Sequence, residues 1–356
     1  MKRIGILTSG GDCPGLNAAI RAVAKASYNK FDVEIIGIKD GFKGLMFENY
    51  RIMKPEDFSG ILTRGGTILG TARTPFKKMR KIESGFNKVK AMVDTYEKLM
   101  LDCIVTLGGN GTHKNTNLLR EEGLNVIALP KTIDNDIWGT DISFGFHSAV
   151  NIATEVIDRI HTTADSHDRV MIVELMGHKA GWLTLYAGLA GGADVILIPE
   201  VPYSMDGVLK AIKKRYDNGK NFSILAVAEG AISIEESMLS KKEFKQMRKN
   251  MKYPSVSYRI ADEISKNLGF ETRVTIPGHQ QRGGSPTPYD RVLATKFGAF
   301  SAKLISDKEF GQTISLVNNK VINKPIEEVA GKLKLVPNDF PLIDTGKSVG
   351  VSFGDE

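Results

Sequence analysis

Short apolar runs alternate with longer amphipathic stretches along most of the chain. Apolar runs bounded by glycine or proline predict buried strands, and apolar residues spaced by three and four predict helices. The expected strands lie at residues 3–7, 33–38, 102–107, 125–130, 170–175, 195–198, 223–227 and 273–276. The expected helices lie at 16–28, 92–101, 113–122, 147–163 and 291–304, with a helix ending at 189 and a polar, largely helical segment at 233–268. This alternation predicts parallel sheets in an α/β fold.

The length of the chain favours two domains. At 356 residues it is long for a single hydrophobic core. Strands and helices alternate again after residue 145, which predicts a second doubly wound unit. The two α/β halves are only loosely similar, and no tandem repeat or low-complexity segment is visible.

Glycine-rich loops follow two of the expected strands. Residues 8–15 follow the first strand and residues 108–112 follow the third, and a helix is expected after each. Backbone N–H groups at the start of a helix attract anions, so both loops favour phosphate binding. The first loop has neither the GxGxxG nor the P-loop lysine pattern, and taken alone it also fits a tight turn between a strand and a helix.

Residues 131–136 carry the most reactive side chains at the end of an expected strand. Asp134 and Asp136 would share one face of an extended segment, where one carboxylate accepts a proton and the other holds a metal ion. A plain turn is the alternative, because Asp and Asn favour turns. Three such loops leave strands expected to end at one edge of a sheet, which favours the ligand-binding interpretation.

Two further segments have chemistry suited to a phosphorylated ligand. Arg73 lies in a second glycine-rich stretch and matches a phosphoryl group bidentately, although a solvated surface arginine is equally consistent. His279, Gln280, Gln281 and Arg282 combine an imidazole, two amides and a guanidinium around glycines. That mixture suits a polyhydroxylated sugar phosphate, with an ordinary polar surface loop as the alternative.

Charge and cysteine content restrict the class of protein. The formal charge is +7, from 48 Lys and Arg against 41 Asp and Glu, and the basic clusters at 77–81 and 241–252 lack interleaved aromatic residues. Small anionic substrates explain this balance as well as nucleic acid does, so charge alone does not decide. The missing aromatic residues give single-strand binding little support, and no nucleic-acid partner is expected. Two cysteines cannot form a disulfide framework, and no apolar run reaches signal-peptide or transmembrane length. We therefore expect a cytoplasmic protein without a membrane partner, in which lone histidines such as His113 are core or surface residues.

Taken together, five segments resemble the 6-phosphofructokinase family over essentially the whole chain. They are residues 8–12, 108–112, 130–136, 176–177 and 278–285. The first two are shared with lipid and NAD kinases, whereas the third and fifth are far more specific. The resemblance implies two similar doubly wound (Rossmann-like) three-layer α/β domains with the active site in the cleft between them. Residues 1–144 with about 281–331 would bind the phosphoryl donor, and residues 145–280 with about 332–356 would bind the sugar.

The resemblance also implies Mg²⁺-dependent phosphoryl transfer from ATP to the 1-hydroxyl of fructose 6-phosphate. Implied catalytic residues are Asp134 as proton acceptor, and Thr132 and Arg73 at the transferring phosphoryl group. Implied donor-binding residues are Gly11, Arg73, Thr74, Gly109, Asn110, Gly111, Thr112 and Lys131, with Asn110 and Asp136 at the magnesium ion. Implied sugar-binding residues are Thr132, Ile133, Asp134, Met176, Gly177, His178, Glu229, His279, Gln280, Gln281 and Arg282. Arg169 and Arg273 would come from a neighbouring subunit of a homo-oligomer, a dimer or a tetramer.

Departures from the family pattern leave other interpretations open. Asn110 stands where the family usually has a carboxylate; its amide oxygen is still a magnesium ligand but brings no charge. Gly111 is the residue typical of ATP users and Lys131 that typical of pyrophosphate users. A carboxylate at 111 would repel an α-phosphate, whereas a lysine excludes neither donor, so we expect ATP. A pyrophosphate-dependent enzyme and a non-catalytic sugar-phosphate sensor remain the alternatives, and Phe42 fits either an adenine contact or the core.

Overall fold

The computed structural model describes residues 1–355, which divide into two compact units. The first unit comprises Met1–Ser148 and Arg282–Lys334. The second comprises Ala149–Gln281 and the described part of Leu335–Glu356. The boundaries expected from the sequence, after residues 144, about 280 and about 331, lie up to four residues before those of the compact units.

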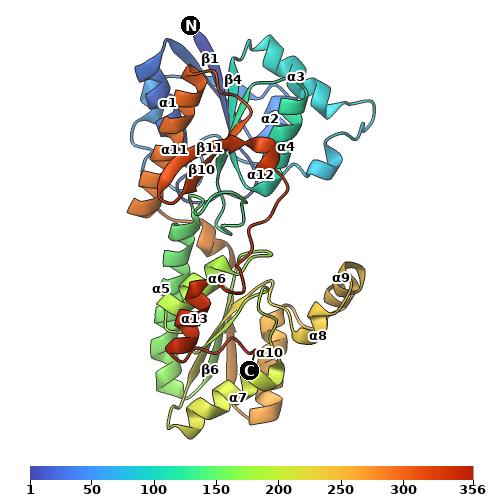
Figure 1. The fold of residues 1–356 in the computed structure, drawn as a ribbon, viewed down its shortest axis with the longest axis vertical. Helices are drawn as coiled ribbons and strands as arrows, with labels where there is room; N and C mark the ends of the chain where they lie inside the picture. Colours follow the sequence, from blue (N-terminus) through green and yellow to red (C-terminus); the bar gives the residue numbers. More distant parts are fainter. Residues whose placement is uncertain (356) are drawn as a thin grey trace. The chain divides into compact units, whose positions relative to one another are not determined.

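Within residues 1–355, the first unit contains a seven-stranded sheet in the order β11-β10-β5-β4-β1-β2-β3 (Figure 1). Its strands are β1 (Lys2–Thr8), β2 (Val33–Ile38), β3 (Tyr50–Met53), β4 (Cys103–Gly108), β5 (Val126–Pro130), β10 (Gln312–Val317) and β11 (Lys320–Pro325). The strands from β10 to β2 are parallel, and the outer strands β3 and β11 are antiparallel to their neighbours. The three strands expected to carry ligand loops, β1, β4 and β5, are therefore adjacent and end at one edge.

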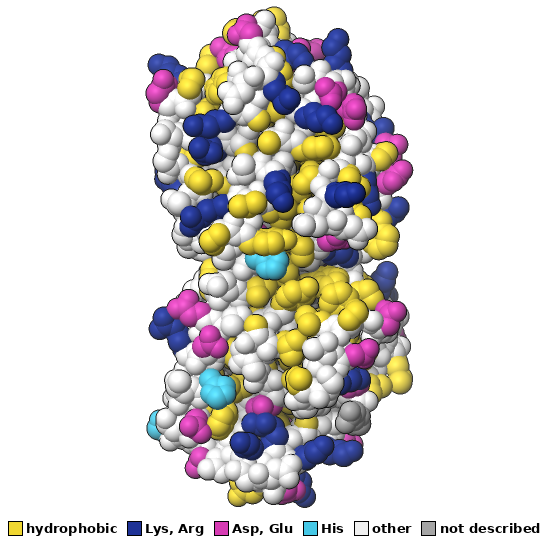
Figure 2. All heavy atoms as spheres, turned by 60° about the vertical axis from the view of Figure 1, so that its left-hand side comes forward, with side chains coloured by type: hydrophobic (Ala, Val, Ile, Leu, Met, Phe, Trp, Pro, Cys, Tyr) yellow, Lys and Arg dark blue, Asp and Glu magenta, His cyan; other side chains and the backbone are white. Residues whose placement is uncertain are grey.

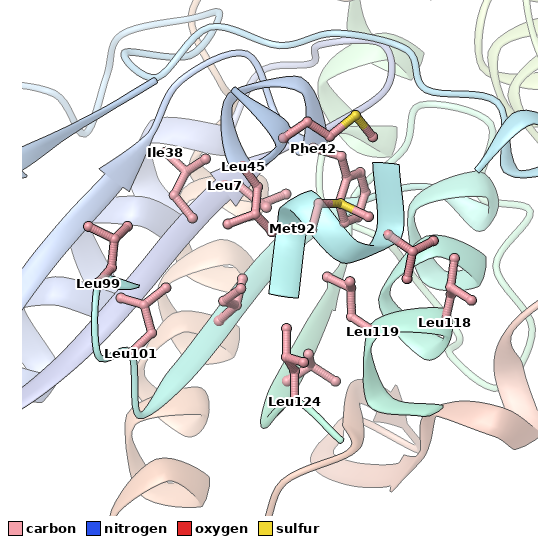
Figure 3. Close-up of a cluster of buried hydrophobic side chains, with 14 of the residues drawn as sticks. Leu7, Ile38, Phe42, Leu45, Met92, Leu99, Leu101, Leu118, Leu119 and Leu124 are labelled. Atoms are coloured by element: carbon pink, nitrogen blue, oxygen red, sulfur yellow. The ribbon is translucent and has the colours of Figure 1, made fainter. Parts of the chain in front are cut away.

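Helices cover both faces of this sheet. Helices α1 (Leu16–Lys30) and α11 (Pro288–Ser306) pack together on one face, and α2 (Phe42–Met46), α3 (Lys88–Lys98) and α4 (Asn110–Glu121) cover the other (Figure 1). Shorter helices are η1 (Pro55–Phe58), η2 (Phe76–Lys78) and α12 (Ile326–Val329). Figure 3 shows the buried side chains between the sheet and α2 to α4, among them Leu7, Phe42, Met92 and Leu119. Phe42 is fully buried in this cluster, so it belongs to the core and is not available to an adenine ring.

The second unit repeats this plan around a smaller sheet. Within residues 1–355 its four strands are all parallel, in the order β7-β8-β6-β9. The strands are β6 (Val170–Leu175), β7 (Val195–Leu197), β8 (Ser223–Ala228) and β9 (Thr272–Thr275). Helices α7 (Met205–Asp217) and α10 (Val256–Leu268) cover one face, and α5 (Phe146–His167), α6 (Trp182–Ala190) and α13 (Pro341–Ser348) the other (Figure 1). The remaining helices are α8 (Ile234–Ser237), α9 (Lys241–Lys249) and η3 (Gly278–Arg282). The α/β, three-layer, doubly wound class expected from the sequence is confirmed.

The surface carries charges of both signs. On the face drawn in Figure 2, lysine and arginine side chains are scattered among acidic ones instead of forming one continuous basic area. No helix within residues 1–355 is long and apolar enough to cross a membrane.

Candidate active site

The stretch expected as a loop after β4 is the first turn of a helix. Gly109 is the N-cap of α4, which begins at Asn110 instead of the expected residue 113. His113 anchors this turn, since its ring nitrogens lie 3.0 Å from Gly109 O and 2.8 Å from Thr313 Oγ1. Burial lowers the pKa of His113 to about 4, so the ring is neutral at neutral pH. The free N–H groups of the turn and the helix dipole favour a phosphate group at residues 109–112.

Gly111 leaves open space in this first turn. The residue is exposed, and a Cβ atom placed on it would meet nothing within 4 Å apart from its chain neighbours and the backbone of its own helix. Its φ lies outside the left-handed region, so neither packing nor backbone geometry requires glycine. A glycine within a helix costs about 1 kcal/mol relative to alanine. The fold does not explain this residue, whereas room for a ligand at the helix start does.

The second glycine-rich stretch lies between the loop after β1 and α4. Gly10 donates its N–H to Ala72 O at 3.2 Å, and Asn115 on α4 donates from Nδ2 to Thr74 O at 2.9 Å. These bonds hold Arg73 and Thr74 beside both phosphate-type segments. Arg73 is exposed, and within residues 1–355 no carboxylate forms an ion pair with it.

Two cations hold the loop that follows β1. The Lys131 side chain, 3% exposed, donates from Nζ to Gly11 O. Arg282 donates from Nη1 to Asp12 O at 3.2 Å, and a Cβ atom on Gly11 would lie 2.5 Å from Arg282 Nη1. Burial lowers the pKa of the Lys131 ammonium. Arg282, expected among the sugar-binding residues, lies in the first unit, where it contacts the loop after β1.

The reactive loop after β5 is bent and not extended. The chain bends at Ile133 and Asp134, and Asn135 has a left-handed backbone with φ +51°. The expectation that Asp134 and Asp136 share one face of an extended segment is therefore wrong. Asp134 donates its N–H to Thr132 Oγ1 at 3.0 Å. Its Oδ1 atom is buried, and no donor within residues 1–355 hydrogen-bonds to it, which leaves this oxygen available as a base.

Asn135 fixes this loop, although the sequence analysis gave it no role. The side chain is 1% exposed; its Oδ1 accepts from Ser143 N at 3.0 Å, and its Nδ2 donates to Asp141 O at 3.2 Å. Asparagine tolerates the left-handed region better than most residues. Asn135 therefore sets the bend that separates Asp134 from Asp136. An asparagine between two aspartates after a strand was the only signal in the sequence.

One segment joins the two residues expected at magnesium. Asn110 accepts from Gly331 N at 3.1 Å through Oδ1 and donates to Lys332 O at 2.5 Å through Nδ2. Lys334 donates its N–H to Asp136 O at 2.9 Å, so residues 331–334 connect both positions. Both polar atoms of the Asn110 amide thus already form hydrogen bonds within the chain. Within residues 1–355 no cluster of three His, Cys, Asp or Glu residues could hold a metal ion by itself.

The two residues expected to bind magnesium are Asp136, a buried carboxylate, and Asn110, an amide that already forms hydrogen bonds. Asp136 is 7% exposed. The pKa of the neighbouring Lys334 is lowered to about 7, because the effect of burial outweighs the opposing effect of the Asp141 and Asp136 charges. Mg²⁺ commonly takes one or two carboxylates and fills its octahedral shell with waters and substrate phosphates. The donor set fits an ion that arrives with the phosphates of a nucleotide.

In the second unit, the sugar-type residues meet at the carboxyl ends of β8, β6 and β9. Glu229 accepts from His178 N at 2.8 Å through Oε1, and its own N–H donates to Leu175 O at 2.8 Å. Gln281 accepts from Met176 N at 3.2 Å through Oε1. The same three loops carry Gly177, His279 and Gln280. The structure thus brings together those expected sugar-binding residues of the second unit that lie in loops directly after a strand.

Arg169 and Arg273 lie near the amino ends of the strands of the same sheet, opposite the carboxyl ends that carry the other sugar-type residues. Arg169 precedes β6 and Arg273 pairs with Met171 near the start of that strand. β6 spans six residues, so roughly 20 Å separates Arg169 from Met176. Both arginines form ion pairs with Glu271, through Arg169 Nε at 3.1 Å and through Arg273 Nη2. Within one chain the structure does not bring them to the other sugar-type residues.

Comparison with known proteins places the chain in a family. The sequence profile described as phosphofructokinase matches residues 3–305. The ATP-dependent 6-phosphofructokinase of Spirochaeta thermophila is 57% identical over 358 residues, covering 99% of this chain and 98% of that protein. The ATP-dependent 6-phosphofructokinase 3 of Bacteroides thetaiotaomicron is 48% identical over 353 residues, covering 99% and 100%. The solved phosphofructokinase of Saccharomyces cerevisiae matches with a TM-score of 0.81 and 30% identity, over 100% of this chain and 47% of the yeast chain. The chain belongs to the phosphofructokinase family.

Proposed function

We propose that the chain is an ATP-dependent 6-phosphofructokinase, which transfers the terminal phosphoryl group of ATP to the 1-hydroxyl of fructose 6-phosphate. The names of the Spirochaeta and Bacteroides relatives support the reaction. The observation that carries the choice of donor is the open space at Gly111, in the first turn of α4. Pyrophosphate would leave that space empty, whereas a nucleotide has an α-phosphate to fill it.

Lys131 does not oppose this donor. Its ammonium group donates a hydrogen bond to Gly11 O in the glycine-rich loop after β1. A cation about 4 Å from a phosphate oxygen is worth roughly 4 kcal/mol before desolvation at an effective dielectric of about 20, whichever donor carries that phosphate. Lys131 therefore assists the transferring phosphoryl group without selecting between ATP and pyrophosphate.

The chain's own residues supply the proton transfer and the positioning. Asp134 takes the proton of the 1-hydroxyl as that oxygen bonds to phosphorus and the bond to ADP breaks. Its buried Oδ1 has no other hydrogen-bond partner within residues 1–355, which suits that role. Thr132 contacts the transferring group, and the exposed Arg73 guanidinium neutralises its charge. Positioning and charge neutralisation supply most of the catalysis in such reactions.

Magnesium would be held by Asp136 and the donor phosphates. When bound, it neutralises the phosphate charge and orients the leaving group. Asn110, whose Oδ1 already accepts from Gly331 N, would add its remaining lone pair while keeping residues 331–334 in place. This division of roles explains how an uncharged residue serves at position 110.

We further propose a cytoplasmic homo-oligomer, a dimer or a tetramer, with sugar sites completed across an interface. The separation of Arg169 from Met176 along β6 supports sharing, because one chain cannot present both to one sugar phosphate. Met176, His178, Glu229 and the His279–Gln281 loop would hold the sugar in one subunit. The arginine pair bound to Glu271 would reach the 6-phosphate of the adjacent one.

The proposal is tested by incubating purified protein with fructose 6-phosphate, ATP and Mg²⁺ and identifying the product by ³¹P NMR. We expect fructose 1,6-bisphosphate and ADP in equal amounts. A protein that binds fructose 6-phosphate but forms no bisphosphate with any donor would instead be a sugar-phosphate sensor.

A further inference from the structure

The segment between β8 and β9 contains a helix that contributes little to the core. Helix α9 extends from the body of the second unit beside the short helix α8 (Figure 1). None of the nine residues of α9 is buried, so hydrophobic packing does not explain why its position is fixed. Phe244 and Met247 are half-buried, and Arg248 ties the helix to the rest of the unit by hydrogen bonds to Ala231 O and Glu236.

Arg248 belongs to a charged cluster with Glu236 and Arg259. Its Nη2 donates to Glu236 Oε2 at 3.0 Å and to Ala231 O at 2.5 Å. Glu236 has a 5% exposed side chain and also accepts from Arg259 Nη1 at 2.7 Å. Arg259 in turn donates to the hydroxyl of the buried Tyr203 at 2.9 Å, which ties the cluster to the core. Two guanidinium groups therefore satisfy both oxygens of one buried carboxylate, a geometry that fixes all three side chains.

The carbonyl that Arg248 holds belongs to the loop carrying Glu229. Ala231 is fully buried and lies two residues after Glu229. Gly230, between them, runs so close to His178 O that no side chain would fit there. Glu229 in turn accepts from His178 N at 2.8 Å. The loops after β6 and β8 are therefore in close contact, so a shift of Ala231 would act on both.

We infer that Arg248 is a positioning residue for the sugar-binding half of the site, acting through Ala231 O on Glu229 and His178. This inference rests on the proposed function, because Glu229 and His178 are assigned to fructose 6-phosphate there. The guanidinium of Arg248 is already engaged by Ala231 O and Glu236, so we assign it to holding the loop and not to the sugar itself. It gives the segment between β8 and β9 a role: to fix one edge of the sugar site from outside.

The test compares Arg248→Met with Lys245→Met, an exposed lysine of the same helix, and with Arg248→Lys. Loss of a hydrogen bond from a charged group to a buried carbonyl predicts a KM for fructose 6-phosphate raised roughly 5–30-fold in Arg248→Met. The KM for ATP and kcat should stay within about twofold. Arg248→Lys should give an intermediate KM, because one ammonium replaces the forked contact. Lys245→Met should match the wild type.

A second readout follows the loop directly. Hydrogen exchange of the peptide that contains His178 N–H should be faster in Arg248→Met than in Lys245→Met. An unchanged KM for fructose 6-phosphate with unchanged exchange would overturn the inference, as would an equal loss in kcat and both KM values. Glu229→Gln separates a failure of the proposed sugar site from a failure of the positioning role of Arg248. If it leaves sugar binding intact, the proposed sugar site is wrong; if it weakens binding and Arg248→Met does not, only the positioning role is wrong.

Discussion

Replacement of Gly111 by aspartate should sharply reduce ATP use while leaving the fold at least as stable. The position lies in the first turn of α4 and has open space around it, so the new side chain meets no steric obstacle. Replacing a helical glycine gains up to about 1 kcal/mol, and a carboxylate near a helix N-terminus adds roughly 0.3–1 kcal/mol. Stability and activity are therefore expected to change in opposite directions.

The loss of activity follows from charge. A carboxylate about 4 Å from an α-phosphate charge costs roughly 4 kcal/mol at an effective dielectric of about 20, equivalent to about 10³-fold in kcat/KM. Because Gly111 is exposed, solvent screening reduces this cost, and half of it still gives roughly 30-fold. Gly111→Ala is the matched control, since it adds a Cβ atom to the same space without charge.

The measurement is kcat/KM for ATP in the wild type and both variants, with the free energy of unfolding measured in parallel. We expect kcat/KM for ATP to fall by roughly 30-fold to 10³-fold in Gly111→Asp and to be largely kept in Gly111→Ala, with neither variant less stable than the wild type. An aspartate variant that uses ATP within a few fold of the wild type would refute the reasoning. An alanine variant as inactive as the aspartate variant would show that the space itself, not the added charge, matters at this position.

Three further predictions concern the base, the subunits and a buried histidine. Asp134→Asn should lower kcat by roughly 10²–10⁴-fold with sugar binding largely intact; near-wild-type turnover would exclude Asp134 as the base. Mixing inactive Arg169→Ala subunits with inactive Asp134→Asn subunits should restore activity, since a hybrid contains one intact site; persistent inactivity after subunit exchange would argue against shared sites. His113 has a folded pKa of about 4 against 6.5 in the unfolded chain, so its stabilising contribution is full above pH 6.5 and is lost as the pH falls towards 4. The free energy of unfolding should fall by up to about 3 kcal/mol over that range, and by less in His113→Asn; equal slopes in both proteins would contradict it.

Local patterns predicted the strands that carry the site. β2 and β6 have the expected bounds, because each is a largely apolar and mostly buried run that contains a single glutamate. The adjacency of β1, β4 and β5 followed from the reasoning that ligand loops gather at one edge. Strands β3, β10 and β11 were missed. β3 and β11 are partly exposed antiparallel edge strands without a continuous buried pattern, and β10 lies in a tail whose pattern was not distinctive.

Long-range hydrogen bonds determined what the sequence did not reveal. The Gly109–Thr112 stretch has the composition of a turn, yet α4 begins at Asn110, where contacts with Gly331 and with Thr313 through His113 fix the turn. These partners lie about two hundred residues away along the chain, beyond the reach of any local rule. The bend at Asn135 depends on Ser143, which is only eight residues away but lies past the strand-end pattern that the sequence shows. Local reasoning therefore found the reactive residues but not the geometry that positions them.

The central claim is that this family member uses a nucleotide because Gly111 leaves room for it. The most direct test measures kcat/KM of the wild-type protein for ATP and for pyrophosphate side by side, with fructose 6-phosphate as acceptor and Mg²⁺ present. We predict the higher value with ATP. A clear advantage for pyrophosphate would contradict the account and would assign Lys131 the deciding role.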